Sequence, residues 1–171
     1  MSDIRLLLSI RRALRRLPTD IVTPIPHAPG SIMQLNPYLN FGGRCAEAFA
    51  FYERQLGARG NGVMLFRDGP AADQVGPEMQ DKVMHASLLF GDVELMGTDG
   101  DGCEAPRAAI TGMHVVLSVD TPEEAERLYA VLAEGGTVEM PMAETFWARR
   151  FGMVVDRFGV PWMINCNRTP E

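Results

Sequence analysis

A pattern of one strand, one helix and three strands occurs twice along the chain, and it constrains the fold more than any other sequence feature. The first copy is predicted at 37–41 (strand), 45–56 (helix), and 62–67, 83–90 and 93–96 (strands). The second is predicted at 113–119 (strand), from 121 onward (helix), and 137–140, 151–155 and 161–165 (strands). One small sheet with one helix buries little alone, so the modules should share a core. We predict an α+β fold of two tandem βαβββ modules forming a curved mixed sheet, with helices outside and a cleft inside.

Both helices are predicted from apolar residues at helical spacing, and they share a local signature. The segments 47–52 (EAFAFY) and 124–129 (EAERLY) align with an offset of 124 − 47 = 77 residues. Thr121 is a suitable N-cap for the second helix, and Glu124 completes a capping box. The repeated order of elements, more than either short match, indicates an internal duplication.

Composition excludes several classes of protein. Of the 171 residues, 46% are hydrophobic and 22% charged, and the net charge of −6 does not favour nucleic-acid binding. The three cysteines are far apart and form no CxxC pair, which argues against a disulfide framework or a zinc cluster. No apolar run approaches the roughly 20 residues that span a bilayer. We expect a cytoplasmic protein without an integral membrane segment, whose partner is a small-molecule ligand.

Residues 1–32 are predicted as a separate segment from a domain at 33–171, whose modules lie at about 34–100 and 110–168. Residues 4–17 have the spacing of a basic amphipathic helix, and a Pro-rich linker follows. This segment is consistent with a membrane-surface helix, with a targeting peptide, or with a dispensable extension before a true start at Met33. The sequence leaves these three interpretations open.

Two stretches of the body resemble a known family. The segment 36–41 (NPYLNF), with Glu47-Ala48 and Phe51-Tyr52 after it, is similar to the opening of PhnB-like proteins. The segments 144–148 (ETFWA), 156–162 (DRFGVPW) and 164–165 (IN) are similar to their closing signature. The chain thus resembles the PhnB-like branch of the glyoxalase/bleomycin resistance/dioxygenase superfamily, also called the vicinal oxygen chelate superfamily. The resemblance covers about residues 34–167 and implies the duplicated fold.

The resemblance also implies a place for a divalent metal ion, because enzymatic relatives bind one with four ligands from the first and last strands of both modules. Glu94 and His114 stand at two of these positions. The third position offers Asn36 or Pro37 and the fourth offers Met163, none of which is a usual ligand for a catalytic divalent ion. A metal cofactor is therefore implied only weakly.

Other residues are candidates for ligand contact rather than for catalysis, and the sequence identifies no catalytic residue. Strand alternation lets His85 face the cleft, and we predict that His85, Glu94 and His114 share it. Glu144, Phe146 and Trp147 could provide a carboxylate beside an aromatic wall.

Two functions remain open from the sequence. The first is a small-molecule-binding protein, with ligand sequestration and no assigned reaction. The second is a divalent-metal-dependent lyase, isomerase or dioxygenase acting on a small oxygen-rich substrate. We further expect a homodimer, because each sheet leaves edge strands that must be covered.

Overall fold

The computed structural model of the chain describes residues 34–70, 72–100 and 110–168. The predicted N-terminal helix and linker lie outside these residues. Residues from Leu35 onward form one compact unit. Among the described helices, none is long and apolar enough to cross a membrane.

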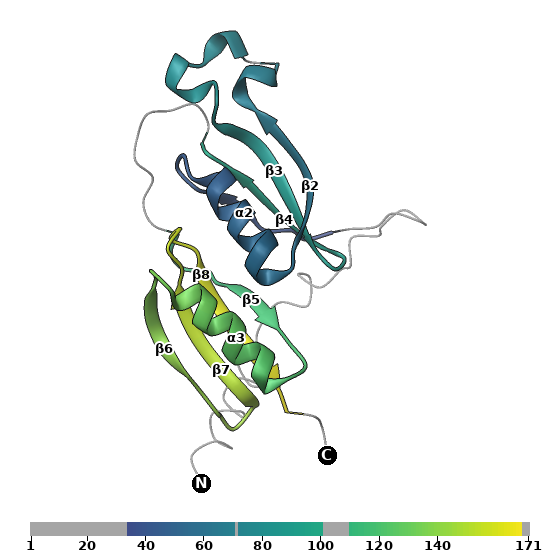
Figure 1. Cartoon of the computed structure of the whole chain (residues 1–171), viewed down its shortest axis with the longest axis vertical. Helices are drawn as coiled ribbons and strands as arrows, with labels where there is room; N and C mark the ends of the chain where they lie inside the picture. The colour runs from purple at the N-terminus through teal and green to yellow at the C-terminus, as the bar shows by residue number, and fades with distance from the viewer. Residues whose placement is uncertain (1–33, 71, 101–109, 169–171) are drawn as a thin grey trace, which may run out of the picture. The chain divides into compact units, whose positions relative to one another are not determined.

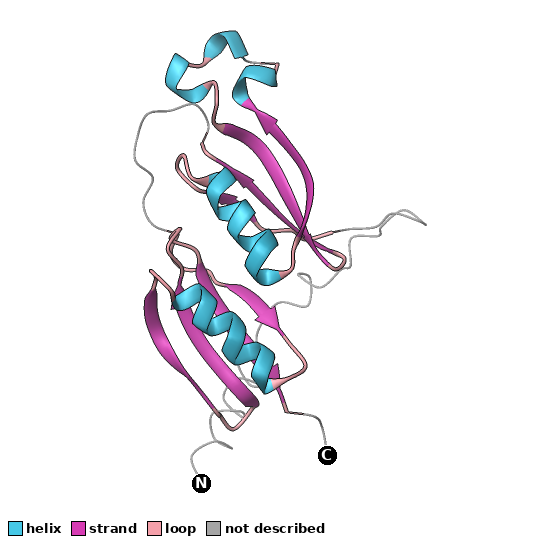
Figure 2. Cartoon of the chain, in the orientation of Figure 1, coloured by secondary structure: helices cyan, strands magenta, loops and turns pink. Residues whose placement is uncertain are grey.

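The first module contains one helix packed on a four-stranded mixed sheet (Figures 1 and 2). The strand order is β1-β4-β3-β2, in which β1 is parallel to β4 and the other pairs are antiparallel. Three short 3-10 helices, η2 (Phe66–Asp68), η3 (Ala72–Gln74) and η4 (Pro77–Met79), connect β2 to β3. The longer elements are β1 (Tyr38–Asn40), α2 (Cys45–Leu56), β2 (Arg59–Leu65), β3 (Val83–Phe90) and β4 (Val93–Thr98).

The second module repeats this arrangement. Its strand order is β5-β8-β7-β6, with β5 parallel to β8 and the other pairs antiparallel. The elements are β5 (Val115–Ser118), α3 (Pro122–Ala133), β6 (Thr137–Ala143), β7 (Ala148–Val155) and β8 (Pro161–Asn167). The predicted tandem βαβββ fold is confirmed, and in the described residues its strands form two separate four-stranded sheets.

The two helices begin in different ways. At the start of α3 the Thr121 hydroxyl accepts the backbone N–H of Glu124 at 3.3 Å, as the capping box predicted. At the start of α2 no neighbouring side chain caps the helix. Buried Asp99 does so instead, accepting the N–H of Cys45 at 2.6 Å and, with its other oxygen, the N–H of Val83 at 2.9 Å. This carboxylate thus fixes α2 to the start of β3.

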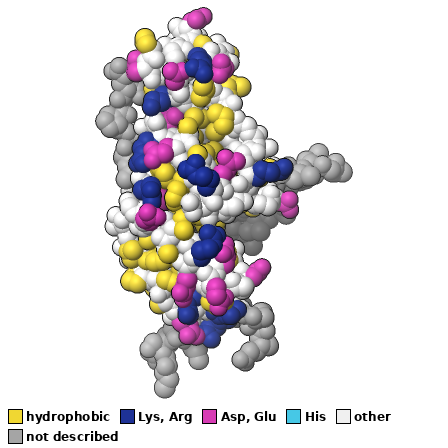
Figure 3. Space-filling model, viewed as in Figure 1, with side chains coloured by type: hydrophobic (Ala, Val, Ile, Leu, Met, Phe, Trp, Pro, Cys, Tyr) yellow, Lys and Arg dark blue, Asp and Glu magenta, His cyan; other side chains and the backbone are white. Residues whose placement is uncertain are grey.

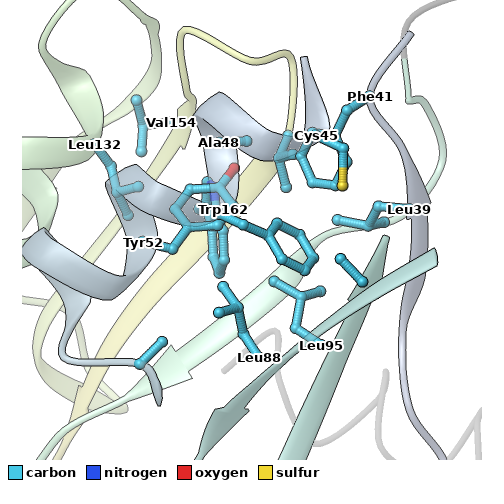
Figure 4. Close-up of a cluster of buried hydrophobic side chains, with 14 of the residues drawn as sticks. Leu39, Phe41, Cys45, Ala48, Tyr52, Leu88, Leu95, Leu132, Val154 and Trp162 are labelled. Atoms are coloured by element: carbon cyan, nitrogen blue, oxygen red, sulfur yellow. The ribbon is translucent and has the colours of Figure 1, made fainter. Parts of the chain in front are cut away.

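The core is continuous between the modules. Cys45, Ala48 and Tyr52 of α2 are fully buried, as is Trp162 of β8. The Tyr52 and Trp162 rings meet edge to face, with centroids 5.4 Å apart (Figure 4). Aromatic pairs in this geometry add to the stability that area burial provides.

Asp156, which is 4% exposed, joins the modules through polar contacts. It accepts the hydroxyl of Tyr52 at 2.6 Å and the indole N–H of Trp162 at 2.9 Å. It also accepts the backbone N–H groups of Phe158 at 2.8 Å and Val160 at 3.0 Å. Burial, followed by the charge of Asp156, raises the pKa of Tyr52, so this hydroxyl stays a donor. The first module thus supplies one of the four donors to this carboxylate, and the second module supplies three.

Candidate functional site

Each sheet has one face covered by its helix and one face without a helix. In the first sheet, Leu39, Ala86, Leu88 and Leu95 are buried in the core. Side chains alternate across a strand. We call the other side the first open face; it carries Tyr38, His85, Ser87, Glu94 and Met96.

The second sheet is built in the same way. Trp162, Ile164 and Cys166 of β8 are fully buried on the α3 side. The other side, here the second open face, carries Val116, Ser118, Phe151, Met153, Met163 and Asn165. The helix side of the molecule instead shows acidic and basic side chains interspersed (Figure 3).

On the first open face, His85 stacks on Tyr38 with ring centroids 5.7 Å apart and an interplanar angle of 27°. The Nδ1 of His85 lies 3.5 Å from the Tyr38 hydroxyl. Tyr38 is 51% exposed, so this pair presents a flat and partly accessible surface. Its chemistry suits contact with a planar ligand.

Glu94 lies on the same face and is held by Asn61 of β2. The Asn61 amide donates to Glu94 Oε1 at 3.0 Å and to Ser87 Oγ at 3.2 Å. This contact fixes one oxygen of the carboxylate. Asn61 was missed from the sequence.

His114 immediately precedes β5, and its Nε2 lies 3.1 Å from Glu139 Oε2. Their side chains are 25% and 40% exposed, so the pair is accessible from solvent. When Nε2 carries a proton that points to Glu139, Nδ1 keeps a lone pair for a ligand. Glu139 comes from β6, at the far edge of the sheet, and was also missed from the sequence.

Asn61 and Glu139 occupy equivalent positions of the duplication. Each is the third residue of a seven-residue strand, and each falls where the ladder register shifts at an irregularity. A bulged residue lies outside the regular alternation, which lets its side chain be aimed in a new direction. Their offset of 139 − 61 = 78 residues differs by one from the helix offset of 77, so the sequence repeat alone does not align them.

The described residues do not fit a complete metal site within one chain. Glu94 is bound by Asn61, and His114 is paired with Glu139. Among the residues that the structure describes, no three His, Cys, Asp or Glu side chains come close enough to hold an ion. A sharing of one cleft by His85, Glu94 and His114 therefore stays a prediction.

The β6–β7 connection carries the candidate aromatic residues. Phe146 and Trp147 pack edge to face with centroids 4.5 Å apart, and Trp147 packs on Phe151 of β7 at 5.6 Å. Phe146 is 89% exposed and Trp147 is 45% exposed. Glu144, in the same connection, forms an ion pair with Arg168. The structure thus brings the aromatic candidates together and gives Glu144 a partner of its own.

A cavity of about 300 Å³ lies between the edges of β4 and β5. Pro37 accepts the N–H of Met96 through its carbonyl at 2.9 Å, but it has no N–H to continue the ladder with β4. The β1–β4 pairing therefore stops before Val93–Leu95. The cavity is lined mainly by apolar side chains, which include Phe90, Val93, Leu95, Val115, Val116 and Trp162.

Comparison with known proteins decides the family. The model of the Glyoxalase/Bleomycin resistance protein/Dioxygenase superfamily matches residues 34–164. The chain belongs to this superfamily. It is 38% identical to Protein YjdN of Escherichia coli strain K12 over 139 residues, which cover 78% of this chain and 95% of that relative.

Two solved structures resemble this chain. Protein PA1353 of Pseudomonas aeruginosa is 44% identical, with a TM-score of 0.73, covering 81% of this chain and all (100%) of that one. A PhnB protein of Bacillus cereus, described as a putative 3-demethylubiquinone-9 3-methyltransferase, is 23% identical with a TM-score of 0.66. It covers 78% of this chain and 99% of its own length, and it supports the fold. The superfamily membership that the sequence indicated is thereby confirmed, and the structure of a PhnB protein shares the fold.

Proposed function

We propose that this superfamily member binds a small planar molecule on the second open face and sequesters it without converting it. The observation that carries the proposal is the aromatic cluster in which exposed Phe146 and Trp147 pack beside half-buried Phe151. Large aromatic side chains left in water favour a partner that covers them. Small-molecule sites combine such apolar surface with a few polar groups.

The polar groups of this face support the same function. The accessible pair of His114 and Glu139 offers a ligand the Nδ1 atom of the imidazole and a carboxylate. Glu144 is 61% exposed at its side chain and paired with Arg168, so we assign it the role of holding the aromatic connection rather than of touching the ligand. The stacked His85 and Tyr38 give the first open face a second, smaller aromatic surface.

Binding of the fluorophore 1-anilinonaphthalene-8-sulfonate tests the proposal. We expect the double variant Phe146→Ala, Trp147→Ala to bind it at least about 10-fold more weakly, because stacking on both rings is lost. The control is Val63→Ala, which removes an exposed apolar side chain from the first module. Equal affinity of the double variant and the control would contradict the proposal.

Metal-dependent lyase, isomerase or dioxygenase chemistry is the second candidate, and the pairing of His114 with Glu139 favours it. An imidazole beside a carboxylate is the beginning of a site for a divalent ion. Purification without chelator, followed by metal analysis and thermal shift with Mn²⁺, Ni²⁺ and Zn²⁺, separates the two candidates. Near-stoichiometric metal that is lost in His114→Ala would favour the enzyme.

We also propose that two copies of the chain form a homodimer. Val93 and Val116, beside the cavity between β4 and β5, are 55% and 53% exposed. Among the described residues, Val93 lies on the part of β4 that β1 does not pair with, and Val116 lies on β5, the end strand of its sheet. Exposed apolar edges favour association with another strand or surface.

A further inference from the structure

We propose that Asn165 selects the ligand of the second open face by accepting a hydrogen bond from it through Oδ1. The inference rests on the proposed binding function and narrows its ligand class. The ligand would be a planar aromatic molecule with an N–H or O–H donor on its ring system.

The first observation is an unsatisfied buried atom. Among the residues that the structure describes, Asn165 Oδ1 is the one buried side-chain nitrogen or oxygen without a hydrogen-bond partner. A buried acceptor left unpaired costs about 1–3 kcal/mol, so native proteins rarely leave one without a partner. A bound donor removes this cost.

The second observation shows that the missing partner is a hydrogen-bond donor. The Asn165 amide nitrogen already donates to Asn167 Oδ1 at 2.8 Å. This bond orients the carboxamide and leaves its oxygen as the group that needs a partner. A donor complements this oxygen, whereas an acceptor, or an apolar group placed there, leaves it unsatisfied.

The third observation is the position of Asn165 beside the aromatic cluster. Its register partners are Ser118 on β5 and Phe151 on β7. Phe151 in turn contacts Trp147. Ile164 and Cys166, its neighbours along β8, are fully buried on the α3 side, so alternation directs Asn165 to the open face. A ring stacked on the cluster would therefore carry its donor toward β8.

Two matched pairs of probes test the proposal, with affinities measured by calorimetry. Indole has an N–H donor that 1-methylindole lacks, and 2-naphthol has an O–H donor that 2-methoxynaphthalene lacks. We expect the native chain to bind each donor probe about 5- to 10-fold more tightly than its methylated partner. Asn165→Leu should bind both members of a pair alike, whereas Asn165→Asp, which keeps an acceptor, should retain the preference.

The outcomes separate this inference from the function on which it rests. If the native chain binds all four probes but equally within each pair, a water molecule or another group satisfies Oδ1 and the inference is overturned. If it binds none of them, the proposed function fails, and the inference fails with it. A preference that persists in a folded Asn165→Leu variant also overturns the inference, and Ser118→Ala controls for nonspecific changes of the face.

Discussion

At the scale of single residues, Asp156 determines how the modules hold together, because its four donors come from both of them. We predict that Tyr52→Phe lowers the free energy of unfolding by about 1–3 kcal/mol, since a buried carboxylate loses one donor while the ring stays packed. Tyr129→Phe is the control, because it removes a 3.2 Å bond to the carbonyl of Met140 in a less buried place. Urea denaturation measures both, and equal losses would contradict the prediction.

The same tyrosine predicts how stability depends on pH. Burial raises the pKa of Tyr52 in the folded chain. In the unfolded chain a tyrosine has a pKa of about 10. Above that pH the unfolded state loses a proton that the folded state keeps, so stability is fully present below pH 10 and falls as pH rises. Burial also raises the pKa of Cys45 to about 12. Because a cysteine in the unfolded chain ionises at about pH 8.5, the loss of stability begins at this lower pH.

We therefore expect the free energy of unfolding to decline from about pH 8.5 upward and more steeply above about pH 10. Urea denaturation at a series of pH values measures the slope. In Tyr52→Phe the additional steepness above pH 10 should become smaller, and Tyr129, whose pKa burial also raises, should account for what remains. A wild-type slope unchanged by this substitution would show that the hydroxyl does not carry the effect.

At the scale of elements, the close approach of β4 to α2 depends on Gly97. A Cβ at Gly97 would lie 2.7 Å from the Phe49 ring and 2.9 Å from Cys45 Sγ. We predict that Gly97→Ala costs about 1–3 kcal/mol, because both neighbours belong to the packed core. Gly60→Ala is the matched control, since its Cβ would meet only the exposed side chain of Glu53. Thermal melts of the two variants should differ clearly, and similar melting temperatures would argue against tight packing at this crossing.

The elements also show what the sequence could predict. Helix periodicity predicted α2 at its observed bounds, and alternation together with the family resemblance placed His85 and Glu94 on one face. Neither pattern predicted that Asp99 caps α2, because 54 residues separate Asp99 from Cys45. The predicted second strand extended to 67, but η2 begins at Phe66. The backbone N–H of Phe66 donates to the carbonyl of Lys82.

The candidate site was predictable only where strands are regular. The aromatic character of 146–147 was visible in the sequence, and the two residues do form one cluster. Asn61 and Glu139 were missed because a register shift breaks the alternation that the prediction relies on. The unsatisfied oxygen of Asn165 depends on all of its spatial neighbours, and no local pattern encodes it.

At the scale of the whole molecule, the unpaired edges of β4 and β5 predict self-association. We expect light scattering at micromolar concentration to give about twice the 18.8 kDa of one chain. The double variant Val93→Lys, Val116→Lys places charges on these exposed edges and should shift the mass toward one chain. A wild-type mass near 19 kDa that does not rise with concentration would exclude the dimer.

The matched bulges of β2 and β6 have an evolutionary consequence. When a gene segment is duplicated, its two copies start with identical chemistry and can diverge only where substitutions leave the fold intact. Because Asn61 and Glu139 lie outside the regular ladder, a mutation there changes which group is held above the sheet without breaking backbone pairing. The equivalent position thus carries an amide that holds a carboxylate in one half and a carboxylate that meets an imidazole in the other. New specificities in such a protein would arise most easily by exchanging these two side chains.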